Sequence, residues 1–311
     1  MELLRKYHIF WLLVLACAPI VFASHWDYNR QDIWPGSCNR GRFQSPINIE
    51  VSRTVFDRSR LRGQLQFSGY ENVAMDVINN GHTVQWSVKS SRPMLRGGPL
   101  NSAYLLDNVH LHWTSEHNIN RAQYWMEIHF VHVKQGLTLA DGLKRSDGLC
   151  VIGVLVHVND WTADQYAFQQ LMPIMNSVMS KNSRPISAGT INLRRFMSKQ
   201  TQHYYTYQGS LTTPDCNEAV IWIVMDQPIT ITQAQYNHMT RPDVGGRFNF
   251  RRLQPVNGVV YRSFPYAQRL QLDNKAGAHF VNPLFYSMFV PCACLKFIRE
   301  LGNFFSNNSS V

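Results

Sequence analysis

The chain has 311 residues, of which 45% are hydrophobic and 16% charged, and its formal net charge is +10. This length and apolar content allow a large buried core and exclude intrinsic disorder, while the low charged fraction excludes a coiled coil. Beyond the N-terminus no apolar run reaches the roughly 18–20 residues of a spanning helix, which excludes a polytopic membrane protein. The cationic residues stand singly or in pairs, so they predict a basic surface and no nucleic-acid site.

Residues 1–23 have the three parts of a secretory signal peptide. Arg5 and Lys6 supply the positive charge, residues 9–15 are apolar, and residues 21–23 form a cleavage site of small-residue type. An uncleaved membrane anchor is the alternative, although the apolar stretch is short for one. The sequence therefore predicts a secreted, extracellular protein that matures in an oxidising compartment.

Six short, β-branched apolar stretches predict strands, because Gly, Pro, Asn and Asp separate them. These stretches are residues 73–78, 83–88, 109–113, 127–133, 149–158 and 219–224. Residues 165–179 carry apolar side chains at helical spacing and predict a helix. With no repeat or linker in between, we expect one sheet-dominated domain over residues 24–265.

Residues 266–311 form a C-terminal tail of different character. The apolar stretch 284–290 is followed by Cys292 and Cys294, and the chain ends in polar residues, which argues against a glycolipid-anchor signal. The tail could pack on the domain, contact a membrane surface or mediate pairing, and the sequence leaves these alternatives open.

Five cysteines remain after removal of the signal peptide, so at least one is free or paired outside the chain. Cys150 lies within an apolar run that predicts a strand buried on both faces. A buried free thiol behaves as a small apolar side chain, and we expect a structural role for Cys150.

Three histidines alternate with apolar residues along two predicted strands. His110 and His112 are two residues apart and share one strand face, and Glu127 and His129 share a face in the same way on the next strand. The sequence separation of 17 from His112 to His129 allows a turn and a returning strand, so three imidazoles can converge. Such a set suits Zn²⁺ and leaves a fourth position open, which is typical of a catalytic site.

A His-x-His pair alone is more often structural than metal-binding, so the third histidine carries the argument. Glu127 strengthens it, because a carboxylate that accepts the N–H of a ligand imidazole orients that ligand. His117 and His132 have no place in this predicted zinc site. His132 points away from His129 and is expected to be structural.

Seven segments, in order along the chain, resemble the α-class carbonic anhydrases. They are residues 41–49, 79–82, 97–100, 110–113, 115–117, 127–132 and 207–214. The resemblance implies a mainly β (α+β) fold, a single domain on a large twisted, mostly antiparallel central sheet with short peripheral helices. It also implies zinc-dependent, reversible hydration of carbon dioxide to bicarbonate and a proton, by attack of zinc-bound hydroxide.

The resemblance assigns roles to individual residues. His110, His112 and His129 match the zinc ligands, and Asn108 and Glu127 match the hydrogen-bond partners of those ligands. The family more often has Gln at the position of Asn108.

Other matching residues imply a substrate site. Thr212 matches a threonine that accepts a hydrogen bond from the attacking hydroxide and donates to Glu116, and Thr213 lies beside the bicarbonate position. Four residues match an apolar wall that holds CO₂: Val131, Val151, Leu211 and Trp222. His82 matches a proton shuttle. Three residues match groups that order waters near it: Tyr28, Asn80 and Gln85.

Two further features bear on this resemblance. Cys38 and Cys216 match a disulfide of secreted and surface-bound members. The interval from His112 to Glu116 is four residues, whereas the family has a longer loop there, so the contact between Glu116 and Thr212 is in question. Two alternatives therefore stand beside an active CO₂ hydratase: an inactive carbonic-anhydrase-related extracellular binding protein, and a zinc esterase.

Overall fold

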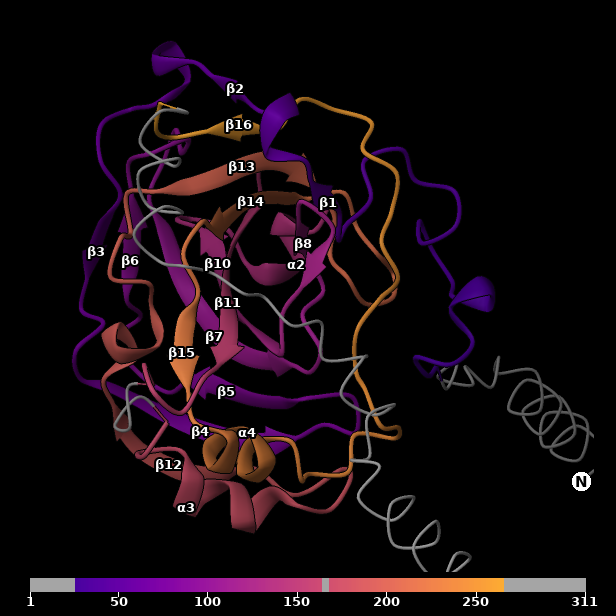
Figure 1. The fold of residues 1–311 in the computed structure, drawn as a ribbon, viewed down its shortest axis with the longest axis vertical. Coiled ribbons are helices and arrows are strands. Elements are labelled where there is room, and N and C mark those ends of the chain that lie inside the picture. Colours follow the sequence, from indigo (N-terminus) through magenta and orange to yellow (C-terminus); the bar gives the residue numbers. More distant parts are fainter. Residues whose placement is uncertain (1–25, 164–167, 266–311) are drawn as a thin grey trace, which may run out of the picture.

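A computed structural model describes residues 26–163 and 168–265. The predicted signal peptide, residues 1–23, and the tail, residues 266–311, lie outside the described residues. Figure 1 shows one large twisted sheet that runs through the molecule, with short helices at its periphery. The prediction of a mainly β fold on a large central sheet is therefore confirmed.

The central sheet has 13 strands, of which ten follow one path from edge to edge. In spatial order these are β12 (Ile186–Ile191), β4 (Val73–Asn79), β5 (Val84–Val88), β7 (Tyr104–His112), β10 (Met126–Lys134), β11 (Leu149–Val158), β14 (Val220–Met225), β13 (Tyr204–Gly209), β16 (Tyr261–Arg262) and β2 (Val55–Phe56). Three further strands pair at its margins: β3 (Gln66–Ser68), β6 (Met94–Arg96) and β15 (Ile229–Ile231). A small second sheet contains β1 (Asn48–Ile49), β8 (Asn118–Ile119) and β9 (Ala122–Gln123).

Most strand pairs of the central sheet are antiparallel, as expected. The parallel pairs of the central sheet, among the described strands, are β11 with β14, β11 with β15, and β16 with β2. In the small sheet, β1 also pairs with β8 in parallel. All six predicted strands are present. The largest difference is at β7, which begins at Tyr104 because polar Asp107 and Asn108 continue the pairing that the apolar pattern alone does not mark.

The helices are short. They are α2 (Leu139–Gly142), α3 (Met172–Met175) and α4 (Gln233–Met239), with 3₁₀ turns at Gln31–Ile33, Val51–Arg53, Arg58–Arg60, Asn176–Val178 and Leu193–Phe196. The helix predicted over residues 165–179 is wrong in extent, since only α3 and the turn after it are helical within the described part of that range. Pro173 explains the limit, because it lacks an N–H and is tolerated only in the first turn of a helix.

Apolar side chains pack on both faces of the central sheet. Val109, Leu111 and Ile128 belong to the larger core on one face. Val131, Val151 and Trp222 belong to a second core on the other face. The first eight residues of β11 are buried on both faces, as its continuous apolar run predicts. The two cores fix the register of β7 and β10, and with it the direction of their polar side chains.

Cys38 and Cys216 form a disulfide across a sequence separation of 178 residues. The bond joins the N-terminal segment to the loop that follows β13. Cys150 is buried with a free thiol near the start of β11, in agreement with its expected structural role. Cys292 and Cys294 lie outside the described residues.

Replacing Cys38 or Cys216 with Ala should lower the free energy of unfolding by about 2–5 kcal/mol, because the bond closes a long loop in the unfolded chain. Chemical denaturation monitored by tryptophan fluorescence measures this loss. The double variant should lose no more than either single variant, since all three lack the same bond. A double variant as stable as the wild-type protein would contradict the assigned pairing.

Candidate active site

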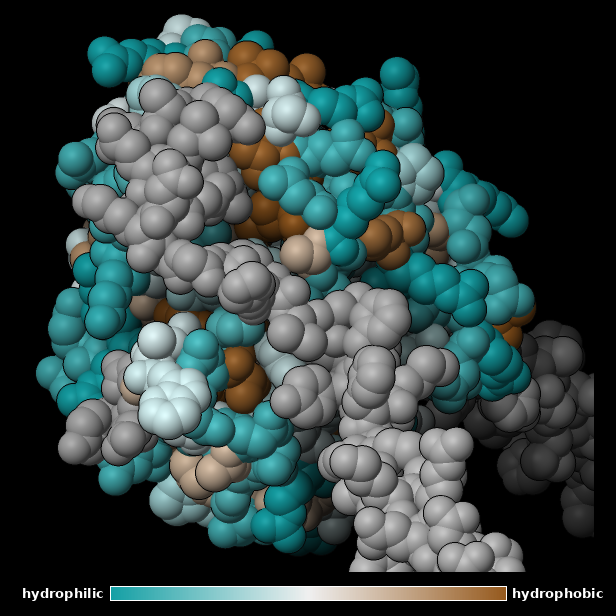
Figure 2. Space-filling model, in the orientation of Figure 1, coloured by the Kyte–Doolittle hydropathy of each residue, from teal (hydrophilic) through white to brown (hydrophobic). Residues whose placement is uncertain are grey.

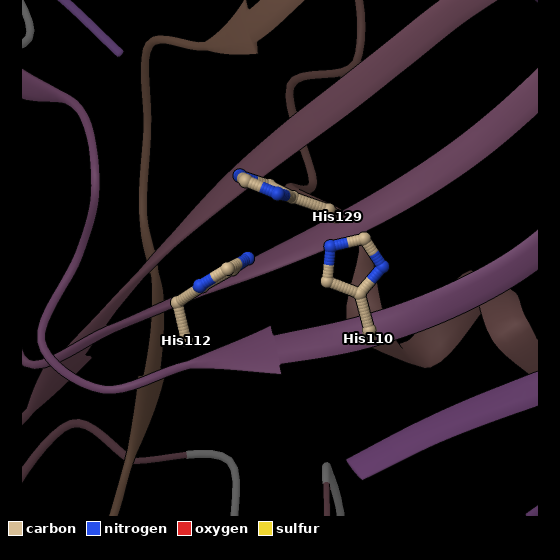
Figure 3. Close-up of side chains that lie close together, drawn as sticks. All are labelled: His110, His112 and His129. Carbon is tan, nitrogen blue, oxygen red and sulfur yellow. The ribbon is translucent and has the colours of Figure 1, made fainter. Parts of the chain in front are cut away.

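Three histidines converge from two neighbouring strands (Figure 3). His110 and His112 extend from β7, and His129 extends from β10, where it lies directly opposite His110 in the antiparallel register. The ring centroids are separated by 5.1 Å for His110 and His112, 5.2 Å for His110 and His129, and 4.6 Å for His112 and His129. One nitrogen of each ring lies within 4.8 Å of the other two.

The remaining nitrogen of each ring is held by a hydrogen-bond acceptor. His110 Nδ1 lies 2.9 Å from Asn108 Oδ1, and His129 Nε2 lies 2.8 Å from Glu127 Oε1. His112 Nδ1 lies 2.6 Å from the carbonyl oxygen of Asn249. An imidazole that donates from one nitrogen presents a lone pair at the other, so His110 Nε2, His112 Nε2 and His129 Nδ1 are the free acceptors of the cluster.

Burial keeps these three imidazoles neutral. It lowers the pKa of His110 well below its usual value and lowers that of His112 to about 4. Burial also lowers the pKa of His129, although Glu127 acts in the opposite direction. Neutral imidazole is the form that binds a metal, so the site needs no deprotonation near pH 7.

A buried carboxylate, Glu127, holds the segment around the site together. Its Oε1 accepts from His129 and from His117 Nδ1 at 2.8 Å, and its Oε2 accepts the backbone N–H groups of Glu116 and His117 at 2.9 and 2.8 Å. Burial by itself raises the pKa of Glu127, but His117 and His129 outweigh it and hold that pKa well below its usual value. His117, which sequence reasoning left over, belongs to this network.

Gly153 makes room for this carboxylate. It lies opposite His129 on β11, and a Cβ atom at this position would lie 2.7 Å from Glu127 Oε1. The sequence contains no signal for this requirement, because a glycine within an apolar strand has several explanations.

Asn249 is the functional residue that sequence reasoning missed most clearly. Besides its carbonyl contact with His112, its side chain accepts from the backbone N–H of Trp113 at 2.8 Å and donates to the carbonyl oxygens of Leu111 and His82 at 2.8 and 3.1 Å. It therefore ties the end of β7 to the turn that carries His82. A backbone carbonyl as the partner leaves no mark in the sequence.

Glu116 reaches the site despite the short interval from His112. Its Oε2 lies 3.5 Å from His112 Nε2 and 3.9 Å from His129 Nδ1, and its Oε1 accepts the backbone N–H of Arg251 at 2.7 Å. Burial raises the pKa of Glu116 to about 7, and His129 and the Thr212 side chain oppose this rise. Glu116 Oε2 is buried without a hydrogen-bond partner. Thr213 lies next to Thr212, and its carbonyl oxygen accepts from the backbone N–H of Cys216.

An apolar row borders the histidines on the same face of the sheet. Val131, Val151 and Trp222 stand side by side in register across β10, β11 and β14. Their exposed fractions are 6%, 1% and 1%, and Leu211 packs against the same core. The Trp222 ring lies 4.9 Å from the ring of His129. The structure thus brings all four predicted wall residues to one place.

A half-buried group of polar and aromatic side chains lies at the edge of this region. The ring of His82 stacks on Trp26 with a centroid distance of 3.7 Å. Asn80 Oδ1 accepts the backbone N–H groups of His82 and Thr83, which shapes the turn. Gln85 pairs with His110 across β5 and β7. Tyr28 has a buried hydroxyl, and its pKa is raised by burial and by the negative charge of Glu116.

The residues present fit a zinc ion. Three neutral nitrogens from His110, His112 and His129 match the preference of Zn²⁺, and His112 Nε2 is buried without a hydrogen-bond partner. His117, Glu127 and His129 form a second group of possible metal ligands. Both imidazoles lie 2.8 Å from Glu127 Oε1, which is a hydrogen-bond distance, so hydrogen bonds explain this group without a metal. His132 lies on the other face, bonded to Tyr70 and to the carbonyl oxygen of Cys150.

The comparisons with known proteins agree with this geometry. Residues 23–264 match the family model described as eukaryotic-type carbonic anhydrase. The chain belongs to the carbonic anhydrase family. It is 35% identical over 280 residues to a Caenorhabditis elegans protein whose name assigns it provisionally as carbonic anhydrase 5; the match covers 81% of this chain and 86% of that protein.

Two mammalian relatives are almost as similar. Rat carbonic anhydrase 4 is 32% identical over 296 residues, which cover 84% of this chain and 92% of the relative. Human carbonic anhydrase 6 is 30% identical over 266 residues, which cover 78% of this chain and 84% of the relative. The α-class assignment made from the ordered motifs is therefore confirmed.

The described part of the chain contains no helix with the length and apolar character needed to cross a bilayer.

Glu127→Gln should weaken zinc affinity by about 10–100-fold, the usual effect of losing a partner that orients a ligand histidine. The amide cannot replace a carboxylate that accepts from two imidazoles and two backbone N–H groups. Competition against a fluorescent zinc chelator measures the affinity. Glu50→Gln is the control, because Glu50 pairs with Arg53 at the surface. Equal affinity in wild-type and Glu127→Gln proteins would contradict the orienting role.

Proposed function

We propose that this protein catalyses the zinc-dependent, reversible hydration of CO₂ to bicarbonate and a proton. The observation that carries the proposal is the convergence of three neutral imidazoles beside a buried apolar row, in a chain of the carbonic anhydrase family. His110, His112 and His129 would hold the metal through the three nitrogens that no acceptor occupies. Bound Zn²⁺ supplies a positive charge that lowers the pKa of a coordinated water to about 7.

Glu116 and Thr212 would orient the attacking oxygen. Glu116 accepts the backbone N–H of Arg251, so its carboxylate is fixed in direction. A hydroxyl has one hydrogen, so a Thr212 hydroxyl that donates to this carboxylate cannot also donate to the attacking oxygen. It can only accept a hydrogen bond from that oxygen. This polarity selects one orientation of the attacking O–H group.

The apolar row would hold CO₂. The substrate is uncharged and has no hydrogen to donate, so it gains little from polar groups and is accommodated by surface that excludes water. Val131, Val151 and Trp222 provide such a surface next to His129, with Leu211 at its border. Thr213 would lie beside the bicarbonate product.

His82 would carry protons between the site and bulk solvent. Its half-buried position, its stacking on Trp26 and its backbone contact with Asn249, which also contacts the end of β7, support this role. An unperturbed histidine titrates near pH 6.5 and can both accept and release a proton at neutral pH. Tyr28, Asn80 and Gln85 would order water along this path.

We also propose that the protein is secreted and works outside the cell. The signal-peptide pattern of residues 1–23 supports secretion, and the disulfide between Cys38 and Cys216 is typical of an oxidising compartment. The zinc-loaded chain would act on a small-molecule substrate, CO₂ or bicarbonate.

Glu116→Gln should lower CO₂ turnover by about 10²–10³-fold while zinc stays bound, because the amide can donate to the Thr212 oxygen and reverse its polarity. Stopped-flow CO₂ hydration, with zinc content measured on the same samples, tests this. The exposed Glu50→Gln variant should retain full turnover. A zinc-replete wild-type protein without CO₂ hydration would overturn the proposed function and favour the inactive extracellular binding protein.

His82→Ala should lower kcat at least about tenfold in dilute buffer, leave kcat/KM nearly unchanged, and recover with added imidazole. A group of pKa near 7 loses protons to water at only about 10³ s⁻¹, whereas carbonic anhydrases reach about 10⁶ s⁻¹. The value of kcat/KM reports attack on CO₂, which a proton relay does not affect. An equal fall in both parameters without rescue would exclude the relay role.

A further inference from the structure

A groove of about 460 Å³ lies at the β2 edge of the central sheet, away from the histidine cluster. Seven large apolar side chains are well exposed among the described residues, and four of them line this one groove: Val55 (43%), Leu253 (43%), Val256 (48%) and Val259 (49%). Exposed apolar side chains are usually scattered singly, so this clustering marks a contact surface. Figure 2 shows hydrophobic surface gathered at the end of the molecule where β2 and β16 lie.

The groove is built from backbone that is already held in place. The backbone N–H of Val55 donates to the carbonyl oxygen of Val260 at 3.0 Å, and that of Gln254 donates to Pro46 at 2.7 Å. The Asn257 side chain donates to the carbonyl oxygen of Arg42 at 2.8 Å. A partner would therefore meet a preformed surface and lose little free energy in ordering it.

The chain itself brings a candidate partner to this place. The described part ends at residue 265, directly after β16, and Tyr261 of β16 pairs with Val55 of β2. Phe264 is 2% exposed and belongs to the same core cluster as Val260. The tail therefore leaves the domain a few residues after the strand whose first residue pairs with the groove residue Val55.

The tail contains an apolar segment at a suitable distance along the sequence. Residues 284–290 are Leu, Phe, Tyr, Ser, Met, Phe and Val, with no charged side chain. The connecting residues 266–283 span up to about 60 Å when extended and about 25 Å as a flexible chain. Attachment to the same chain gives the segment a millimolar effective concentration at the groove, far above that of a second copy in dilute solution.

We propose that residues 284–290 dock in the groove lined by Val55, Leu253, Val256 and Val259. Docking removes apolar surface of both partners from water, which is the favourable free-energy change available to an uncharged segment and to the four exposed apolar side chains of the groove. Glu50 and Arg53 also line the groove and pair with each other. The tail is then a packing element of the folded protein. This inference is independent of the proposed CO₂ hydration, because none of the groove residues belongs to the histidine site.

Hydrogen–deuterium exchange of the full-length chain tests the proposal. In the wild-type protein, amides of residues 284–290 should exchange at least about tenfold more slowly than in an unstructured peptide of the same sequence. The Val256→Asp/Val259→Asp variant should remove this protection. A Phe285→Asp/Phe289→Asp variant of the tail should, in turn, raise exchange in residues 253–260 and leave zinc content unchanged.

Leu139→Asp is the matched control. Leu139 is 43% exposed, as is Leu253, but it lies on α2 and does not line the groove. This control should leave protection of residues 284–290 as in the wild-type protein.

Four results would overturn the proposal. The first is exchange of residues 284–290 at the unstructured rate. The second is protection that disappears on dilution, which would identify a second copy as the occupant. The third is protection that appears only with phospholipid vesicles, which would indicate membrane contact. The fourth is a secreted protein whose mass shows that residues 284–290 have been removed.

Discussion

The buried negative charge of Glu127 is the constraint on which the site depends. Burying a charged carboxylate away from water is unfavourable in free energy unless its oxygens accept hydrogen bonds. Glu127 accepts four hydrogen bonds, from donors on three residues. Meeting that demand fixes the tautomer of His129, the ring of His117 and the backbone at Glu116. The hydrogen bonds to this carboxylate therefore fix the backbone that follows β7. They restrict the conformations open to the short connection from His112 to Glu116.

A second support comes from far along the sequence. The segment from Asn249 to Arg251 contacts His112 and Trp113 at one end of the short connection and Glu116 at the other. The Arg251 guanidinium is itself buried and donates to the carbonyl oxygens of Cys38 and Ser45. The disulfide region and the histidine cluster are thus parts of one hydrogen-bonded structure, although the sequence separates them widely.

The histidine cluster could be predicted because its signals are local. The alternation of His110 and His112, and of Glu127 and His129, follows from the two-residue period of a strand, and each strand also carries apolar residues that fix its inward face. Asn249 and Gly153 could not be predicted, since one acts through a backbone carbonyl and the other through the side chain it lacks. The prediction of a helix over residues 165–179 was wrong in extent for a related reason. The apolar residues at helical spacing do pack in the core, but Pro173 limits the helical hydrogen bonding, and tertiary contacts bury these side chains without a long helix.

The contact between Asn249 and His112 also sets an order of events during synthesis. A nascent chain that has reached β10 already contains all three histidines, but it lacks the carbonyl that selects the tautomer of His112. That carbonyl lies near the end of the domain, so it leaves the ribosome only when nearly the whole domain has been made. The hydrogen-bonded arrangement of the three histidines is therefore complete only when nearly the whole domain is available.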